Sequence, residues 1–290
     1  MVRTAVFTAN IIGFKLLEKL HSLNFYPKVV TYDTAFRRTG LSKDFSPFED
    51  KFSIMYLQYN KYEYNKNILD RLDCDNVVCI DWTKDFFKKS QPEFNVIQMQ
   101  PSLLPKYRGY GCISEQFEKG VYQSGVTFYK SSDKVDAGDI IYQKTLRIEY
   151  DDYPEDFIEN IVDISAGFII DIEKNGLKNY KASPQNEDEA FYIIRKRSKN
   201  AIIDFGRDAY SIYNQIRAFS RPFFGAYFYS GATKVKVFRA KTEKWQGYFG
   251  EPGEIIKNDE NGAEIACGSG TIALNEVEIN NQIYYNYIPL

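Results

Sequence analysis

A strand, a helix and a second strand follow one another in the first 33 residues, and this alternation constrains the fold more than any other feature. Residues 3–9 form a short β-prone run, residues 14–23 carry leucines at helical spacing, and residues 28–33 form a second β-prone run. Strands that alternate with helices pair in parallel and are covered by those helices. We therefore expect an α/β fold with a parallel sheet, and we interpret the opening residues as its first strand and not as a signal peptide.

The same patterns extend this α/β region to residue 176. Pro154 and Gly176 suit the first turn and the C-terminal cap of a long helix, and residues 36–50, which lack a clear period, are predicted to form a loop. Further strands are expected at 52–57, 76–80, 94–99, 124–130 and 138–148, and helices at about 60–72, 112–119 and 154–176.

The pattern changes after residues 178–190, a polar stretch that we interpret as a linker. A helix is expected at 209–219, and a series of short strands follows it. These strand patterns are separated by turn residues and lie at 225–230, 234–240, 253–257, 264–268, 270–279 and 282–290. Such a series is typical of a small β-barrel or sandwich. We therefore predict two domains, residues 1–190 and residues 191–290.

The charge balance limits the partners of this chain. Lys and Arg number 37 and Asp and Glu number 39, which gives a net charge of −2. Nucleic-acid binding needs many contacts from basic side chains to phosphates, so this balance argues against a nucleic-acid partner. A local basic cluster keeps that alternative open, and it consists of Lys234, Lys236, Arg239, Lys241 and Lys244.

Hydropathy and cysteine usage indicate a cytoplasmic protein with no membrane partner. The mean hydropathy is −0.43, and no apolar run approaches the ~18 residues that a membrane-spanning helix needs. The four cysteines lie far apart without the spacing of metal ligands, which favours free thiols in a reducing cytoplasm and no bound metal; they are Cys74, Cys79, Cys112 and Cys267. His21, the one histidine of the sequence, falls on the first predicted helix and is interpreted as a surface or packing residue.

Two segments carry motifs that point to a function: FNVIQMQPSLLPKYRG at residues 94–109 and DKVDAGDIIYQ at residues 133–143. Together they resemble the motifs of the folate-dependent formyltransferases. Residues 201–228 and 252–274 are similar to the C-terminal domain found in methionyl-tRNA formyltransferase and in the formyltransferase that modifies UDP-4-amino-4-deoxyarabinose. The resemblance implies a Rossmann-like formyltransferase domain followed by a small β-rich, OB-like domain.

The resemblance also implies a reaction. The family moves a formyl group from 10-formyltetrahydrofolate to an amine, and it uses an Asn, a His and an Asp to do so. Attack by the amine develops negative charge on the formyl oxygen. A hydrogen-bond donor must therefore stabilise that oxygen, and a proton acceptor must serve the attacking ammonium.

This sequence departs from the family at two of these three positions. Gln98 and Gln100 stand where the family has Asn and His, whereas Asp136 matches. Their spacing places both glutamines on one face of a strand. Because an amide does not exchange a proton near pH 7 as an imidazole does, we expect impaired catalysis. The flanking motif residues are all family-like, so we favour deliberate substitution to trap a complex over the alternative of a naturally degenerate member.

The resemblance assigns further residues to ligand binding. The site for the formyl donor, where the family places the pterin, is expected to include Asp81, Trp82, Val135 and Ala137. The site for the acceptor is expected to include Asn10, Ser102, Lys106, Tyr107, Arg108, Arg195 and Arg197.

Structural interpretations compete with binding at four of these places. Asn10 follows the first strand and suits a plain helix cap. Trp82 could pack in the core instead of stacking on the pterin, and Arg108 could form a salt bridge that stabilises its loop. The basic run at residues 195–197 is more usually a solvated face.

Three function classes remain: a nucleotide-sugar N-formyltransferase, methionyl-tRNA formyltransferase, and a non-catalytic relative that binds ligands. The net charge of −2 weighs against tRNA, and the aromatic residues around 122–153 and 210–229 suit stacking on a base or a sugar. We therefore predict the sugar enzyme. By resemblance its acceptor is a dTDP- or UDP-linked amino sugar, with dTDP-4-amino-4,6-dideoxyglucose or the 3-amino isomer favoured, and a homodimer is compatible with this assignment.

Overall fold

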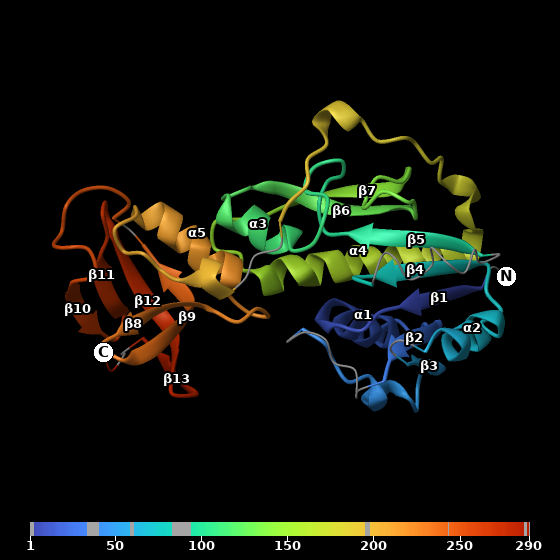
Figure 1. Ribbon diagram of the computed structural model, residues 1–290, viewed down its shortest axis with the longest axis horizontal. Coiled ribbons are helices and arrows are strands. Elements are labelled where there is room, and N and C mark those ends of the chain that lie inside the picture. The colour runs from blue at the N-terminus through green and yellow to red at the C-terminus, as the bar shows by residue number, and fades with distance from the viewer. Residues whose placement is uncertain are drawn as a thin grey trace. The chain divides into compact units, whose positions relative to one another are not determined.

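The computed structural model describes residues 3–33, 41–58, 61–82, 94–194, 198–242, 244–286 and 289. The chain forms two compact units, each assembled from several stretches of sequence (Figure 1). The N-terminal unit comprises Met1–Tyr110, Gln123–Arg147 and Phe157–Ile193, and the C-terminal unit comprises Gly111–Tyr122, Ile148–Asp156 and Ile194–Leu290. The division at residue 190 stays a prediction.

A seven-stranded sheet forms the centre of the N-terminal unit, with the strand order β3-β2-β1-β4-β5-β6-β7. Its strands are β1 (Thr4–Phe7), β2 (Lys28–Tyr32), β3 (Ile54–Leu57), β4 (Asn76–Ile80), β5 (Asn95–Gln100), β6 (Gln123–Lys130) and β7 (Ile140–Arg147). The pairings from β3 to β5 are parallel, whereas β6 pairs antiparallel with both β5 and β7. The connection between β6 and β7 is too short for a parallel crossover, which explains the antiparallel pairing of these two strands.

Helices cover both faces of this sheet. Helix α1 (Ile11–Ser22) buries Leu16, Leu17 and Leu20. Lys15 and Lys19 of this helix form ion pairs with Glu159 and Asp163 of helix α4 (Pro154–Asn175), so the two helices lie on the same face. Helix α2 (Tyr62–Asp70) covers the opposite face.

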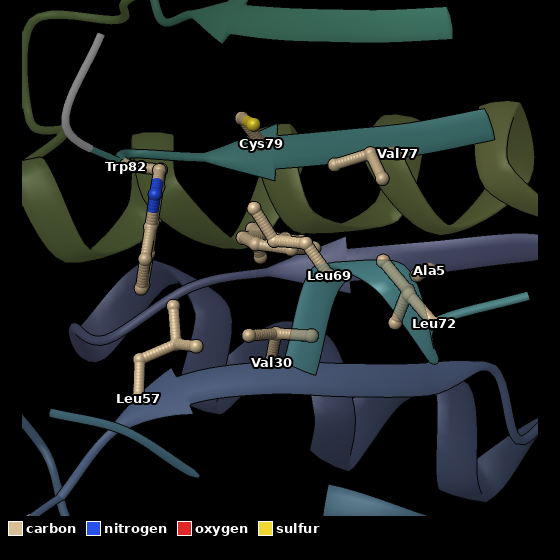
Figure 2. Close-up of a cluster of buried hydrophobic side chains, with 9 residues drawn as sticks. Ala5, Val30, Leu57, Leu69, Leu72, Val77, Cys79 and Trp82 are labelled. Carbon is tan, nitrogen blue, oxygen red and sulfur yellow. The ribbon is translucent and has the colours of Figure 1, made fainter. Parts of the chain in front are cut away.

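The core on the α2 side is made of apolar side chains that the strand register places in rows. Ala5 pairs with Val77, and Phe7 pairs with Cys79, so all four point to one face. Leu69 of α2 and Leu72, which follows this helix, belong to the same cluster (Figure 2). Gln98 of β5 is in register with Cys79 and therefore faces the same side. The row of apolar residues thus ends in a polar one at β5.

The C-terminal unit is β-rich and antiparallel, with the order β10-β11-β12-β9-β8 and β13 paired to β12. Helix α5 (Ala209–Phe219) begins at the N-cap Asp208, whose side chain accepts from the Ser211 N–H. The strands are β8 (Ala226–Ser230), β9 (Thr233–Lys241), β10 (Ile255–Asp259), β11 (Gly262–Ala266), β12 (Thr271–Ile279) and β13 (Gln282–Tyr285), and helix α3 (Cys112–Glu118) also belongs to this unit.

The predicted fold class is confirmed: a mostly parallel sheet with flanking helices is followed by a β-rich antiparallel region. The predicted linker at 178–190 differs from its expected form, because Ser183 pairs with Ile140 of β7 through two backbone hydrogen bonds of 2.8 and 2.9 Å. Among the described residues, no helix is long and apolar enough to cross a membrane.

Candidate active site

The carboxyl end of β5 presents two polar side chains, Gln98 and Gln100, on the same face of the sheet. Gln98 is in register with Cys79 of β4 and with Tyr129 of β6. Only 3% of the Gln98 surface is exposed, and its Nε2 atom has no hydrogen-bond partner among the described residues. A buried donor without an acceptor is costly, because its desolvation is not repaid by a hydrogen bond.

Gln100 is buried as well, but its amide is fully engaged on the donor side. The Nε2 atom donates to the carbonyl oxygens of Tyr107 and Gly109, both at 2.9 Å. These bonds fasten the loop that follows β5 to the strand itself. Gln100 therefore fixes the backbone at the position where the family motif has a histidine, and its donors are not available to a ligand.

Asp136 lies in the turn between β6 and β7 and is buried, with a left-handed backbone at φ 55°. Its carboxylate accepts from the Tyr129 hydroxyl and from the Gly109 N–H, the latter at 2.7 Å. Burial and the neighbouring Asp136 charge raise the pKa of Tyr129 well above its ordinary value, so the phenol keeps its proton and remains a donor.

Two of the three predicted catalytic positions, Gln100 and Asp136, thus meet at the backbone of Gly109. Gly109 receives a hydrogen bond from Gln100 at its carbonyl and donates one to Asp136 from its N–H. Glycine suits this position because its φ is 105° and because a Cβ atom here would lie only 3.0 Å from the Ile193 carbonyl oxygen. The geometry ties the loop after β5 to the carboxylate of the β6–β7 turn.

Arg108 is completely buried, and hydrogen bonds engage all of its donors. Nε and Nη2 donate to Gln185 Oε1 at 3.1 and 2.8 Å. Nη1 and Nη2 form a bidentate pair with Glu187 at 3.0 and 2.6 Å, and Nη1 also donates to the Tyr192 hydroxyl. This arrangement favours the salt-bridge interpretation of Arg108 over direct binding of an acceptor phosphate.

The other predicted residues of the loop after β5 differ in exposure. Ser102 is buried and donates to the Lys106 carbonyl oxygen at 3.1 Å, which closes a tight turn. Lys106 is exposed, and Tyr107 is half-buried with its ring against Phe191 at 4.7 Å between centroids. Lys106 and Tyr107 are therefore the loop residues best placed to meet a ligand.

Asn10 and Asp81 meet at the carboxyl ends of the neighbouring strands β1 and β4. The Asn10 side chain caps helix α1 by accepting from the Ile12 and Gly13 N–H groups at 3.1 and 3.3 Å, and its Nδ2 donates to the Asp81 carboxylate. The predicted cap is therefore present, and the same side chain links two strand ends of the sheet. Such strand ends are where open α/β sheets bind ligands.

Trp82 packs in the core of the N-terminal unit. Its ring stacks on Tyr32 at 4.5 Å and 8° and meets Phe7 edge-on at 5.4 Å. Figure 2 shows it at the end of the apolar cluster beside Leu57. This geometry favours the packing interpretation over stacking on a pterin.

Val135 and Ala137 flank Asp136 in the β6–β7 turn and are half-buried. The Val135 carbonyl accepts from the Tyr192 hydroxyl at 3.2 Å. Arg195 and Arg197 lie outside the described residues, so their predicted role in acceptor binding stays a prediction.

Sequence reasoning missed two residues of this site, Tyr129 and Gln185. Tyr129 could have been found from strand alternation, because it lies opposite Gln98 once the β5–β6 register is known. Gln185 lies in the stretch interpreted as a linker, where no local signal distinguishes it.

Ion pairs neutralise most of the basic cluster that the sequence places on β9 and beyond. Lys236 pairs with Glu278, Arg239 with Glu276 at 3.5 Å, and Lys244 with Glu264 at 2.6 Å. Lys234 lies over the ring of Tyr227 at 3.6 Å. The acidic partners belong to β11 and β12, which are neighbours in the same sheet as β9.

The cysteines are free thiols, and burial raises the pKa of Cys79 well above its ordinary value. In the described part of the chain, no group of three or more His, Cys, Asp and Glu side chains could hold a metal ion.

Comparison with known families assigns both parts of the chain. Residues 41–171 match the family described as formyl transferase, and residues 196–286 match the formyl transferase C-terminal domain. The chain belongs to the formyl transferase family. The family resemblance of the sequence motifs is thereby confirmed.

Two relatives in sequence carry the name methionyl-tRNA formyltransferase. Methionyl-tRNA formyltransferase of Thermotoga maritima is 33% identical over 191 residues, which are 65% of this chain and 60% of that protein. The chain thus spans less than two thirds of that relative. Methionyl-tRNA formyltransferase of Wigglesworthia glossinidia brevipalpis is 25% identical over 278 residues, covering 93% of this chain and 86% of the relative.

A solved structure shares the fold over almost the whole chain. The N-formyltransferase from Helicobacter canadensis, in complex with folinic acid and dTDP-3-aminofucose, has a TM-score of 0.66 at 19% identity. The match covers 94% of this chain and 99% of that one. At this identity the likeness concerns the fold.

Proposed function

We propose that this protein is an N-formyltransferase that uses 10-formyltetrahydrofolate to formylate a nucleotide-linked amino sugar, with turnover strongly reduced by Gln98 and Gln100. The observation that carries the proposal is the Nε2 atom of Gln98, a buried donor without a partner among the described residues. Gln98 lies on β5, which also carries Gln100, and it is opposite Tyr129 of the neighbouring strand β6. A neutral carbonyl oxygen is the acceptor that would satisfy this donor without burying a charge.

The residues present fit a formyl donor at this end of the sheet. The donor supplies an electrophilic carbonyl carbon, whose oxygen gains negative charge when an amine attacks. Gln98 Nε2 would donate to that oxygen, which is the role of an oxyanion donor. The carboxyl ends of β1, β4 and β5, with Asn10, Asp81 and Gln100, would border the site.

The proton balance explains why turnover should be slow. The attacking amine must lose a proton, and Gln100 cannot accept it. Asp136 is the carboxylate of the site, but it already accepts hydrogen bonds from Tyr129 and Gly109. A general acid or base typically contributes about 10²–10⁴-fold to a rate, so its loss leaves a protein that binds its ligands but reacts slowly.

A nucleotide-linked amino sugar is the acceptor that the charge distribution supports. Binding of tRNA needs a face of unpaired basic side chains, whereas Lys236, Arg239 and Lys244 are each paired with a glutamate. The alternative acceptor is methionyl-tRNA, which is favoured by the names of the relatives from Thermotoga and Wigglesworthia.

A screen of acceptors tests the proposal. The chain and its Gln98→Asn, Gln100→His double variant are incubated with 10-formyltetrahydrofolate and either dTDP-4-amino-4,6-dideoxyglucose, its 3-amino isomer, the corresponding UDP sugars or charged initiator tRNA. We expect formylated sugar with the double variant and little product with the chain itself. Formylation of the tRNA and of none of the sugars would assign the alternative function.

A further inference from the structure

Gln185 uses its whole side-chain amide to join two loops of the N-terminal unit. Its Nε2 donates to the carbonyl oxygens of Asp136 and Gly138 at 2.8 and 2.7 Å. Its Oε1 accepts from Nε and Nη2 of Arg108 at 3.1 and 2.8 Å. Both hydrogens and both lone pairs of the amide are therefore occupied.

The donor side of this amide fixes the turn that carries Asp136. Asp136 has a φ of 55°, a conformation that costs energy for a residue other than glycine and persists only where the surroundings enforce it. Gln185 holds the carbonyl of this residue and the carbonyl two residues later. The direction of the Asp136 side chain therefore depends on the two bonds from Gln185.

The acceptor side of the same amide reaches the loop after β5 through Arg108. The Arg108 backbone also pairs with the stretch beyond Gln185, because its N–H donates to the Phe191 carbonyl at 3.1 Å and its carbonyl accepts from the Ile193 N–H at 2.9 Å. Gln185 thus contacts both loops of the site, as does the Tyr192 hydroxyl of the same stretch, but Gln185 is the one of the two that holds the Asp136 carbonyl.

We infer that Gln185 is a positioning residue, whose two donated hydrogen bonds set the place of the Asp136 carboxylate in the formyl-transfer site. This inference rests on the proposed function for its catalytic consequence. The geometric part, that Gln185 governs the environment of Asp136, can be measured without any activity.

Gln215 provides a matched control in the C-terminal unit. Its Nε2 also donates to two backbone carbonyls, those of Asn200 and Ile202 at 2.9 Å each, and its Oε1 accepts from Arg207 at 3.3 Å. It is buried to a similar degree as Gln185. The same substitution at the two positions therefore removes the same kind of bonds, but only one of them holds Asp136.

The decisive substitution is Gln185→Glu. It keeps an oxygen for Arg108 and removes both donors to the Asp136 and Gly138 carbonyls, whereas Gln185→Met removes both sides and Gln185→Asn keeps a shorter amide. In the Gln98→Asn, Gln100→His background we expect Gln185→Glu to lower kcat about 10²-fold with KM for the formyl donor nearly unchanged, because misplacement of a reacting group acts on the chemical step. Gln185→Asn should retain part of the lost rate, and Gln215→Glu should leave kcat unchanged.

The second measurement is the NMR chemical shift of the Tyr129 ring carbon that bears the hydroxyl. It is made with labelled tyrosine in a chain that keeps Gln98 and Gln100. The resonance is assigned by its loss in Tyr129→Phe. Because this hydroxyl donates to Asp136, Gln185→Glu and Gln185→Asn should shift the resonance, and Gln215→Glu should not. A shifted resonance without activity in any background would overturn the proposed function and retain the positioning role. An unshifted resonance in folded Gln185→Glu and Gln185→Asn, or an equal fall of kcat in Gln215→Glu, would overturn the positioning role.

Discussion

At the carboxyl end of β5 the polar side chains bond to backbone groups, whereas on the β9–β12 face of the C-terminal unit they bond to one another. Gln100 donates to the carbonyls of Tyr107 and Gly109. Glu276, by contrast, takes Arg221 and Arg239 as partners at 2.8 and 3.5 Å. At the end of β5 the Gln98 amide donor has no partner among the described residues. On the β9–β12 face most of the charged side chains form ion pairs.

The two regions differ in whether their polar groups are satisfied without a ligand. Ion pairs between partly exposed side chains can separate and re-form at little cost, so the paired charges of the β9–β12 face need no further partner. A buried amide donor has no such freedom, since its desolvation cost remains until an acceptor arrives. A ligand at the end of β5 would supply the acceptor that the buried Gln98 amide lacks among the described residues.

The largest expected effect comes from restoring the family residues at the two glutamine positions. The Gln98→Asn, Gln100→His double variant should raise the rate of formyl transfer about 10²–10⁴-fold, because an imidazole can accept the proton of the amine. Gln100→His alone should recover more rate than Gln98→Asn alone if proton transfer limits the reaction. The two effects act on one transition state and should not simply multiply.

Steady-state rates of the chain, both single variants and the double variant measure these effects. The reverse order of the single variants would show that stabilisation of the oxyanion limits the reaction. A chain that already turns over at about 1 s⁻¹ or faster would show that the catalytic positions are placed wrongly.

The sequence predicted the elements that depend on local patterns. The spacing of Gln98 and Gln100 was sufficient to place both on one face of β5, since side chains alternate along a strand. The Asn10 cap was likewise readable from its place before a helical pattern.

Partners that are distant along the chain could not be predicted. Arg108 and Gln185 are separated by 77 positions, and the pairing depends on how the stretch after α4 returns to the sheet. Composition could count the lysines of β9, but it could not show that Glu276 and Glu278 lie beside them, because that follows from the register of β9 and β12. The binding roles of Arg195 and Arg197 remain predictions.

The next largest effect is a difference between Gln98 and Gln100 in their contribution to the free energy of unfolding. Gln100→Met should lower the free energy of unfolding by about 1–3 kcal/mol, since it leaves the Tyr107 and Gly109 carbonyls without their donor. Gln98→Met should be neutral or stabilising by about 1 kcal/mol, because it removes a buried donor that has no partner.

Urea unfolding of the two variants and of the parent chain provides the measurement. Methionine has a similar volume to glutamine, so packing changes little at either position. Equal destabilisation by both substitutions would contradict the distinction between a satisfied and an unsatisfied amide. Binding of formyl-folate should weaken in Gln98→Met, which links the same atom to the ligand.

A smaller effect is expected from releasing basic side chains on the β9–β12 face. Glu276→Gln with Glu278→Gln removes the carboxylates that pair with Lys236, Arg221 and Arg239. Arg239 keeps Glu155 as a partner at 4.0 Å. Binding of tRNA at low salt should then rise by no more than about tenfold, with a steeper salt dependence of roughly one unit for each new phosphate contact. Filter binding across a salt series measures both quantities.

The control for this prediction changes the net charge equally without breaking an ion pair. Glu251→Gln with Glu254→Gln is suitable, because these carboxylates accept from the Tyr248 hydroxyl and the Glu251 N–H. An equal rise in tRNA affinity in this control would attribute the effect to net charge. Tight tRNA binding by the parent chain at physiological salt would instead contradict the expectation that this chain has no nucleic-acid partner.

The smallest expected effect concerns the ion pair between Arg108 and Glu187. Hydrogen bonds from Arg108 lower the pKa of Glu187 below its ordinary value of 4.5. A lowered pKa means that the pair contributes stability above pH 4.5 and loses it as the pH falls through the lower, folded-state pKa. Glu187→Gln should therefore be less stable than the parent chain at neutral pH, and the difference should shrink as the pH falls through that window. Thermal unfolding of both chains from neutral pH to acid tests this, and a difference that stays constant across the series would show that Glu187 acts on Arg108 only through a neutral hydrogen bond.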